Sequence, residues 1–382
     1  MYLNTKNFIE LNQNSLVKFL GAKIKEDLYL DYKVDLSSSE KRKAHKEFLK
    51  DVTAFANANG GNILIGVCEP SEDLTIDKQL LGIANANEYS QDLERLTVSN
   101  IDPRISGLRI KVVPLSNNKS VIAIHIPPSL NRPHMVNYDS HRTFYMRHSE
   151  SSFPMTTHEI RNSVMESLSA EEKAKNYLNE KEADIRDYFL DNTPSFIIQA
   201  MPLISLESSW DIFDKKIEKI MLGDSRRYNY LYDLASNMMP RPTIDGLLGR
   251  DQRDNPNWQT EIHRNGYVSL VYKNQFPSLL ENSKTFIIHS GFEKLFDSFL
   301  GMVEELLTVT NTDVPYIISC KYIGANKTHL FSDNLLGNYS EVYGKEDIIF
   351  PFHYRQVGEP MNSIAGQLCL ELFNAYGFKN IL

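Results

Sequence analysis

The sequence predicts an α/β protein of two domains, each of which combines strands and helices. The chain has 382 residues, which is enough for more than one domain. Both halves contain short runs with a period of two, typical of strands, and longer runs with helical periodicity. A charged helical stretch over residues 166–192 separates them. We therefore predict an N-terminal domain over 1–165, a helical linker, and a C-terminal α/β domain over 193–382.

The composition is that of an ordinary soluble protein, with 42% hydrophobic and 24% charged residues. No apolar run approaches the roughly 18 residues that a membrane-spanning helix needs, and the first residues lack a signal-peptide pattern. Three cysteines, Cys68, Cys320 and Cys369, lie far apart in the sequence. They argue against a disulfide framework or a cysteine zinc site. We expect a reduced, cytoplasmic protein without contact to a membrane.

The net charge of −8 argues against a protein that coats nucleic acid by bulk attraction. The charge is nevertheless uneven along the chain. Residues 1–165 carry 20 Lys+Arg against 19 Asp+Glu, a balance of +1, which leaves 21 against 30, or −9, for the remainder. A polyanion would therefore prefer the N-terminal domain and would bind it locally.

The first strand is predicted over residues 28–34, where apolar and polar side chains alternate. Leu30 and Tyr32 fall on the buried face of this pattern. Asp31 and Lys33 fall on the opposite face, which we expect to be exposed.

A helix should follow this strand. Ser37 and Glu40 have the spacing of a capping box, and the helix should run to Asn59, with Gly60 as its left-handed stop. Its apolar face lies opposite four basic residues, Arg42, Lys43, Lys46 and Lys50. Residues 63–68 are apolar on both faces, which predicts a central strand.

The remaining elements follow from the same patterns. In the N-terminal domain they are strands over 109–114, 121–126 and 143–147, and a helix from Thr156 or Thr157 through Val164. In the C-terminal domain they are strands over 195–198, 266–272, 285–289, 314–320 and 348–353, and helices over 224–237, 292–307 and 362–376.

Three acids and a lysine, Glu26, Asp31, Glu69 and Lys33, stand near the ends of the first two strands. If they converge, the carboxylates can bind Mg²⁺ or Mn²⁺ and lower the pKa of a bound water, while Lys33 stabilises charge on a phosphorane. The alternative is a surface ion pair between Asp31 and Lys33, which spacing alone favours. Glu26 is an odd number of residues from Asp31, so it can join the site only from outside the strand.

Basic and aromatic residues suggest a surface for nucleic acid. The basic residues are Arg42, Lys43, Lys46 and Lys50 on the predicted helix, and Arg142, Arg147 and His148 around Phe144 and Tyr145. Cations interleaved with aromatic rings suit a nucleic-acid backbone with partly unstacked bases. A solvated helix face is the alternative explanation for the helical group.

The order of these motifs resembles the Schlafen AlbA-like domain family over roughly residues 15–165. Glu26 is followed, after four residues, by Asp31-Tyr32-Lys33, then by Ala54-Phe55-Ala56-Asn57-Ala58-Asn59-Gly60-Gly61 and Ile65-Gly66-Val67. Ile126-Pro127-Pro128-Ser129, Arg132-Pro133-His134 and Phe144-Tyr145-Met146-Arg147-His148-Ser149 come later. Asp31 stands where the family usually has Glu.

The resemblance implies a mixed sheet with flanking helices and a domain that binds nucleic acid. Animal relatives are metal-dependent endoribonucleases that cleave transfer and ribosomal RNA through three carboxylates. By resemblance this chain is a divalent-metal-dependent endoribonuclease, with Glu26, Asp31 and Glu69 as metal ligands and Lys33 beside them. Those relatives also carry a zinc site, but this sequence lacks the set of cysteines that such a site needs. The animal relatives build a saddle from two related lobes in one chain, whereas this chain has one such lobe, so the resemblance implies a homodimer or larger homo-oligomer. The resemblance to bacterial members of the family implies an effector of antiphage defence.

Two alternatives remain open. One is a non-catalytic DNA- or RNA-binding regulator that uses the same domain. The other is a partner-binding or structural protein whose functional surface lies in residues 190–382. Under the family resemblance, the acidic C-terminal domain would serve oligomerisation or sensing, with a protein partner or a small-molecule trigger.

Overall fold

The structure is a computed structural model that describes residues 8–35, 41–71, 74–204, 210–222, 240–251, 254, 256–273, 285–310, 312–332 and 338–378. The chain forms two compact units, residues 1–170 and 171–382. Helix α6, Thr157–Tyr188, contributes residues to both units. In the part of the chain that is described, no helix is long and apolar enough to span a membrane.

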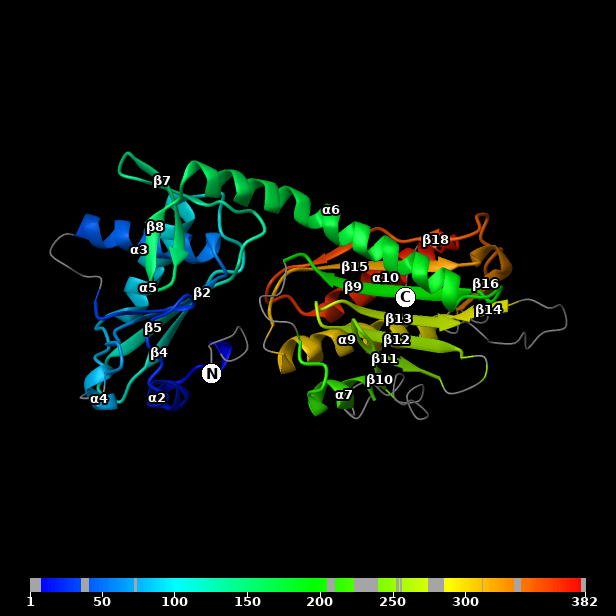
Figure 1. Ribbon diagram of the computed structural model, residues 1–382, viewed down its shortest axis with the longest axis horizontal. Coiled ribbons are helices and arrows are strands. Elements are labelled where there is room, and N and C mark those ends of the chain that lie inside the picture. Colours follow the sequence, from blue (N-terminus) through cyan, green and yellow to red (C-terminus); the bar gives the residue numbers. More distant parts are fainter. Residues whose placement is uncertain are drawn as a thin grey trace. The chain divides into compact units, whose positions relative to one another are not determined.

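The N-terminal unit is built on a mixed four-stranded sheet in the order β1-β2-β5-β4 (Figure 1). Its strands are β1, Leu30–Lys33; β2, Gly61–Ile65; β4, Arg109–Pro114; and β5, Ser120–Ile126. β1 and β2 are parallel and are joined through helix α3, Lys41–Asn57, whereas the other pairs are antiparallel. All five residues of β2 are buried, which confirms a central strand.

Helices cover both faces of this sheet. α3 and α5, Ala86–Asn100, pack their apolar side chains against one face, and α2, Gln13–Gly21, packs against the other. The short helix α4, Ile76–Gln79, follows β2 in sequence. Because the sheet has apolar side chains on both faces, two separate clusters form the core of this unit.

A second sheet, in the order β3-β6-β7-β8, packs on the other side of α3. Its strands are β3, Ile101–Asp102; β6, Met135–Tyr138; β7, His141–His148; and β8, Ser151–Pro154. The Asn57 side chain ties the end of α3 to this sheet. Its Nδ2 donates to the carbonyl oxygens of His134 at 2.9 Å and Tyr145 at 2.8 Å. Gly60 follows with a φ of 73°, so the left-handed stop is confirmed.

The C-terminal unit is built on an antiparallel sheet in the order β10-β11-β12-β13-β9-β15-β18 (Figure 1). Strand β19 also pairs with β15. The strands are β9, Ser195–Pro202; β10, Arg241–Pro242; β11, Gly246–Arg250; β12, Trp258–His263; β13, Val268–Lys273; β15, Tyr316–Ile323; β18, Ile348–Ile349; and β19, His353–Arg355. One face carries the main core.

Helices α9, His289–Val309, and α10, Ala365–Ala375, supply apolar side chains to that core, together with α7, Lys215–Met221. A small sheet in the order β14-β16-β17 accompanies them. Its strands are Thr285–Ile288, Thr328–Ser332 and Asn338–Tyr339, and the 3-10 turns η1 and η2 span Ala325–Lys327 and Met361–Ile364.

Most predicted elements are confirmed, two differ in extent, and several elements of the structure were not predicted. The helix predicted to end at Val164 continues to Tyr188, because no Gly or Pro interrupts it. The strand predicted over 348–353 is two strands, since Pro351 cannot donate to a ladder and separates β18 from β19. The elements that were not predicted include helices α5 and α7 and strands β6, β8, β11, β12 and β16. The helix predicted over 224–237 and the capping pair Ser37 and Glu40 lie outside the described residues.

Candidate nucleic-acid interface

A network of four charged side chains, three of them buried, lies where β1, α3 and β7 meet. Lys33 Nζ is 2.7 Å from Asp31 Oδ2 and 3.1 Å from Asp51 Oδ2. Arg147 Nη2 is 3.4 Å from Asp31 Oδ1. Two acids therefore alternate with two cations, and the network is neutral as a whole. We call these four residues the ion network.

The position of Asp31 corrects the prediction of an exposed strand face. Asp31 is only 3% exposed, because α3 and β7 cover the side of β1 that the alternation assigned to solvent. Arg147 is also 3% exposed. Its Nε donates to the carbonyl oxygen of Asp27 at 2.9 Å, and its guanidinium lies 4.3 Å from the ring centre of Phe55. Arg147 thus holds the interior together and is not available to a phosphate in this arrangement.

The electrostatics match a tightly paired interior site. Burial lowers the pKa of Lys33, but the charges of Asp51 and Asp31 outweigh that effect and raise it to about 12. Burial also raises the pKa of Asp51, although Lys33 opposes the rise. A buried charge without a partner is costly, so each member of the ion network depends on the others.

Asp51 is the residue of this network that the sequence reasoning missed. A signal for it exists, because Asp51 stands three residues after Phe48 and four before Phe55 on the apolar face of α3. Its side chain is part of the buried surface, with 4% exposed, and Ser152 Oγ donates to its Oδ1 at 3.0 Å. An acid on the apolar face of a helix needs an internal partner, and here that partner is Lys33.

Glu26 and Glu69 lie beside this network. Glu26 precedes β1 and so lies outside the strand, as the odd spacing requires. Its Oε1 accepts a hydrogen bond from the Tyr32 amide at 2.8 Å, and its own amide donates to Glu69 Oε1 at 3.2 Å. Burial raises the pKa of Glu26, and the charges of Asp31 and Glu69 add to the rise. The three predicted metal ligands therefore come into one neighbourhood.

Their donor atoms, as placed, do not fit a divalent cation. The two oxygens of Asp31 face Lys33 and Arg147, while Glu26 and Glu69 each accept a backbone amide. Within the described ranges, no group of three or more His, Cys, Asp or Glu side chains is arranged to hold a metal ion. Metal binding here would require Asp31 to exchange its two cationic partners for the metal.

Three of the seven predicted nucleic-acid contacts do come together. Arg42, Lys43 and Lys46 line a hollow of about 370 Å³ between α3 and the tip of the β6–β7 hairpin. The hairpin contributes the other lining residues, Tyr138, Asp139, Ser140 and His141. We call these seven residues the basic hollow.

The hairpin side of the basic hollow is well defined. Asp139 and Ser140 have φ values of 49° and 63°, which are typical of a two-residue turn that keeps the strands in register. The Tyr138 hydroxyl lies 3.3 Å from His45 Nδ1 of α3, so the hairpin is attached to the helix. Arg42 is 84% exposed at its side chain, and its guanidinium is 3.9 Å from Asp139.

The other predicted contacts lie elsewhere. Lys50 pairs with Glu47 and lies 3.9 Å from Asp51, at the edge of the ion network. Arg142 is exposed, and its Nε donates to Asn137 Oδ1 at 3.4 Å. His148 Nε2 lies 3.0 Å from a carboxylate oxygen of Glu159.

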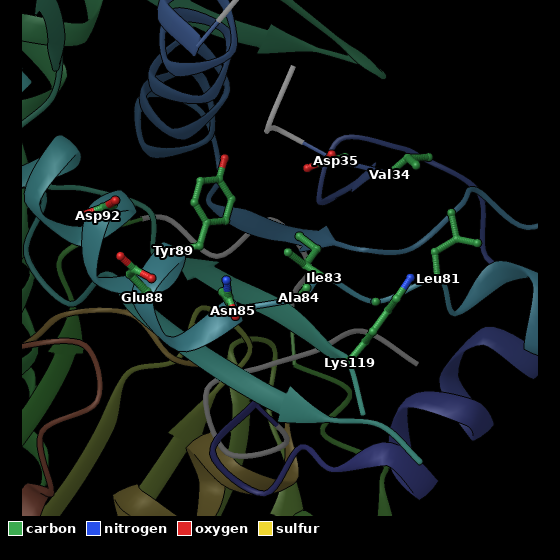
Figure 2. A pocket seen from close by; sticks show the side chains of 11 residues that line it. Val34, Asp35, Leu81, Ile83, Ala84, Asn85, Glu88, Tyr89, Asp92 and Lys119 are labelled. Carbon is green, nitrogen blue, oxygen red and sulfur yellow. The ribbon is translucent and has the colours of Figure 1, made fainter. Parts of the chain in front are cut away.

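A second hollow, of about 570 Å³, has the opposite charge. It lies between the end of β1 and helix α5, and Figure 2 shows Val34 and Asp35 on one side and Glu88, Tyr89 and Asp92 on the other. Burial, together with the charges of Asp35 and Asp92, raises the pKa of Tyr89 to about 12. The full lining, which we call the acidic hollow, is Val34, Asp35, Leu81, Gly82, Ile83, Ala84, Asn85, Glu88, Tyr89, Asp92 and Lys119.

Comparison with known proteins identifies this unit. Residues 26–156 match the family described as Schlafen, AlbA_2. This part of the chain is a Schlafen AlbA_2 domain. The match includes the ion network, both carboxylates beside it and the basic hollow, and the resemblance seen in the sequence is confirmed. It supports a function related to nucleic acids.

Among solved structures, part of the chain is similar to the N-terminal domain of a putative ATP-dependent DNA helicase RecG-related protein from Nitrosomonas europaea, determined by NMR. That match has 16% sequence identity and a TM-score of 0.24, and it covers 34% of this chain and 81% of that chain. None of the curated proteins matches the chain.

Proposed function

We propose that the AlbA_2 domain binds RNA through the basic hollow. The observation that carries the proposal is that Arg42, Lys43 and Lys46 line one hollow together with Tyr138 and His141. Three cations on one exposed stretch of helix suit consecutive phosphates, and the two rings beside them suit unpaired bases. RNA offers such bases in its loops and single-stranded ends.

The surroundings of the hollow favour a preformed site. The buried face of α3 packs through Phe48, Val52 and Phe55, while its basic residues stay on the outside. Asn57 fixes the far end of the helix to the second sheet. The helix and the hairpin therefore keep their spacing without a ligand, and little ordering opposes binding.

The test is the affinity for a fluorescent single-stranded RNA, measured by anisotropy over a range of salt concentrations. Three phosphate contacts predict that the logarithm of the association constant falls with the logarithm of salt with a slope of about −2. The variant Arg42→Ala/Lys43→Ala/Lys46→Ala should lose most of this slope. Its matched control is Lys18→Ala/Lys25→Ala/Lys78→Ala, which removes three exposed lysines elsewhere in the same domain.

Equal losses in the two triple variants would mean that RNA responds to overall charge alone, and the basic hollow would then have no special role. Duplex DNA and transfer RNA are measured alongside. A clear preference for duplex DNA would replace RNA as the proposed ligand and leave the hollow as the binding site.

A second candidate is metal-dependent RNA cleavage, and the gathering of Glu26, Asp31 and Glu69 beside Lys33 is the observation that favours it. Mg²⁺ or Mn²⁺ would be the metal. Since Asp31 is engaged by Lys33 and Arg147, RNA binding without cleavage agrees better with the donor arrangement.

Incubation of total transfer RNA with the parent protein, in Mg²⁺, Mn²⁺ or EDTA, separates the two candidates. Binding that persists in EDTA with no cleavage products supports the binding role. Metal-dependent products that disappear in both Glu26→Gln and Glu69→Gln would assign the cleavage role instead. These two variants leave the ion network intact, so a loss of activity cannot be attributed to its collapse.

A further inference from the structure

The two hollows of the AlbA_2 domain have walls of the same composition with the signs of charge reversed. The basic hollow is lined by three Lys or Arg side chains and one acid, Asp139. The acidic hollow is lined by three acids and one Lys side chain, Lys119. Because both surfaces belong to one chain, a second copy of that chain offers each of them an electrostatically complementary partner.

The two hollows adjoin at the first turns of α3. His45 of this helix has its Nδ1 at 3.3 Å from the hydroxyl of Tyr138 in the basic hollow. Asp92 of the acidic hollow is close enough to the same ring for its charge to oppose the fall in the pKa of His45 that burial and Lys41 cause. The two walls therefore form one patch that is positive at one end and negative at the other. We call it the dipolar patch.

The charges of the dipolar patch are open to exchange. The side chain of Arg42 is 84% exposed and lies 3.9 Å from Asp139. The side chain of Asp92 is 43% exposed and lies 3.6 Å from Arg95. Exposed ion pairs of this kind contribute little to stability, so partners from another molecule can replace them at small cost.

The acidic hollow also offers apolar surface to a partner. Val34 is 51% exposed and Leu81 is 37% exposed, and Figure 2 shows Val34 next to Asp35. Lys and Arg side chains cover apolar surface with their methylene stems while their charged ends reach nearby acids. The wall therefore suits the long basic side chains of a protein partner.

We propose that two copies of the chain pair through the dipolar patch, with the basic hollow of each copy against the acidic hollow of the other. A two-fold axis forms both contacts at once, because it turns the positive end of one patch onto the negative end of its equivalent. Exposed ion pairs make the contact weak, and we expect it at protein concentrations of about 100 µM. RNA titrations use far less protein. The pairing does not depend on the proposed RNA-binding role.

The test is sedimentation equilibrium of the full chain, without RNA, over a range of protein concentrations. The average mass should rise towards that of a dimer at about 0.05 M salt and stay that of a monomer at about 1 M salt, where the Debye length is about 3 Å. A chain that remains monomeric at low salt, or a dimer that survives high salt, would overturn the proposal.

Two charge reversals locate the contact. Arg42→Glu/Lys46→Glu makes both ends of the patch negative. Glu88→Lys/Asp92→Lys makes both ends positive. Each variant alone should associate at least about tenfold more weakly than the parent, because like charges then meet in both contacts. An equimolar mixture of the two variants should restore pairing, since opposite charges meet again in both contacts. A mixture that does not pair would contradict the proposal.

The matched control is Lys18→Glu/Lys25→Glu, which changes the net charge as much as the first reversal at exposed positions outside both hollows. It should leave association nearly unaltered, and a loss as large as that of the reversal would mean that only the net charge matters.

Should a reversal prevent folding, the neutral variants Arg42→Gln/Lys46→Gln and Glu88→Gln/Asp92→Asn replace the two reversals. Each should still associate more weakly, and their mixture should regain one of the two contacts. Unchanged association in both neutral variants would rule out the dipolar patch as the interface.

Discussion

The basic hollow and the acidic hollow belong to the same AlbA_2 domain and have opposite charge. Arg42, Lys43 and Lys46 line the first, and Asp35, Glu88 and Asp92 line the second. The residues before 166 have a net charge of only +1, so the total conceals this separation. The binding site for a polyanion therefore depends on where the fold places the charged side chains and not on the net charge of the domain.

The acidic hollow adjoins the ion network at the end of β1. Lys33 belongs to the ion network, and the next two residues, Val34 and Asp35, line the acidic hollow. Strand β1 thus contains a buried acid, Asp31, whose charge is paired internally, and the exposed acid Asp35, which lines the acidic hollow, follows two residues after the strand ends. These two aspartates should respond very differently to substitution.

The largest expected effect is on stability. Asp31→Ala leaves Lys33 and Arg147 without a shared counter-charge in the interior, and loss of one partner of a buried pair costs about 3–5 kcal/mol. Asp35→Ala removes an exposed acid and should change the free energy of unfolding by less than about 1 kcal/mol. Urea denaturation of both variants measures the difference. Similar values for the two would mean that the ion network does not hold the domain together.

The next effect is on RNA affinity. Arg42→Ala/Lys43→Ala/Lys46→Ala should weaken binding at low salt by at least about tenfold, since each lost phosphate contact lowers the salt slope by about 0.7. The change should leave the unfolding midpoint nearly unaltered, because all three side chains lie outside the core clusters. Anisotropy and thermal unfolding on the same samples separate lost contacts from lost structure.

The smallest effect comes from the acidic hollow. Glu88→Gln/Asp92→Asn removes two negative charges from its wall, and RNA affinity should rise by less than about threefold at 0.1 M salt, where the Debye length is about 10 Å. A tenfold loss of affinity in this variant would reverse the roles of the two hollows, for that would make the acids part of the RNA site.

Sequence patterns predicted the central sheet of the AlbA_2 domain because periodicity is a local property. The alternation in β1 correctly assigned Tyr32 and Asp31 to opposite faces of the strand. It could not predict that β7, more than a hundred residues later in the sequence, buries the face that carries Asp31. The convergence of Glu26 with Glu69 followed from the parallel pairing of β1 and β2. Asp51 was visible in principle as an acid on an apolar helix face.

The face of the C-terminal sheet that the second half of α6 contacts was harder to foresee. Gln259, Glu261 and His263 of β12 alternate with core residues as solvent-facing residues would. Local sequence does not reveal that Tyr177 of α6 lies against His263. The helix itself was predicted in two pieces, so its role as a cover could not be inferred. Long-range pairing of this kind depends on the whole fold and not on any one segment.

The central claim is that RNA occupies the basic hollow, and photo-crosslinking tests it most directly. Each hollow contains one tyrosine, Tyr138 in the basic hollow and Tyr89 in the acidic one. A single-stranded RNA with 4-thiouridine, crosslinked to the full chain in EDTA and mapped by mass spectrometry, should label the peptide that contains Tyr138 and spare the peptide that contains Tyr89. Labelling centred on Tyr89, or on the C-terminal unit, would contradict the account.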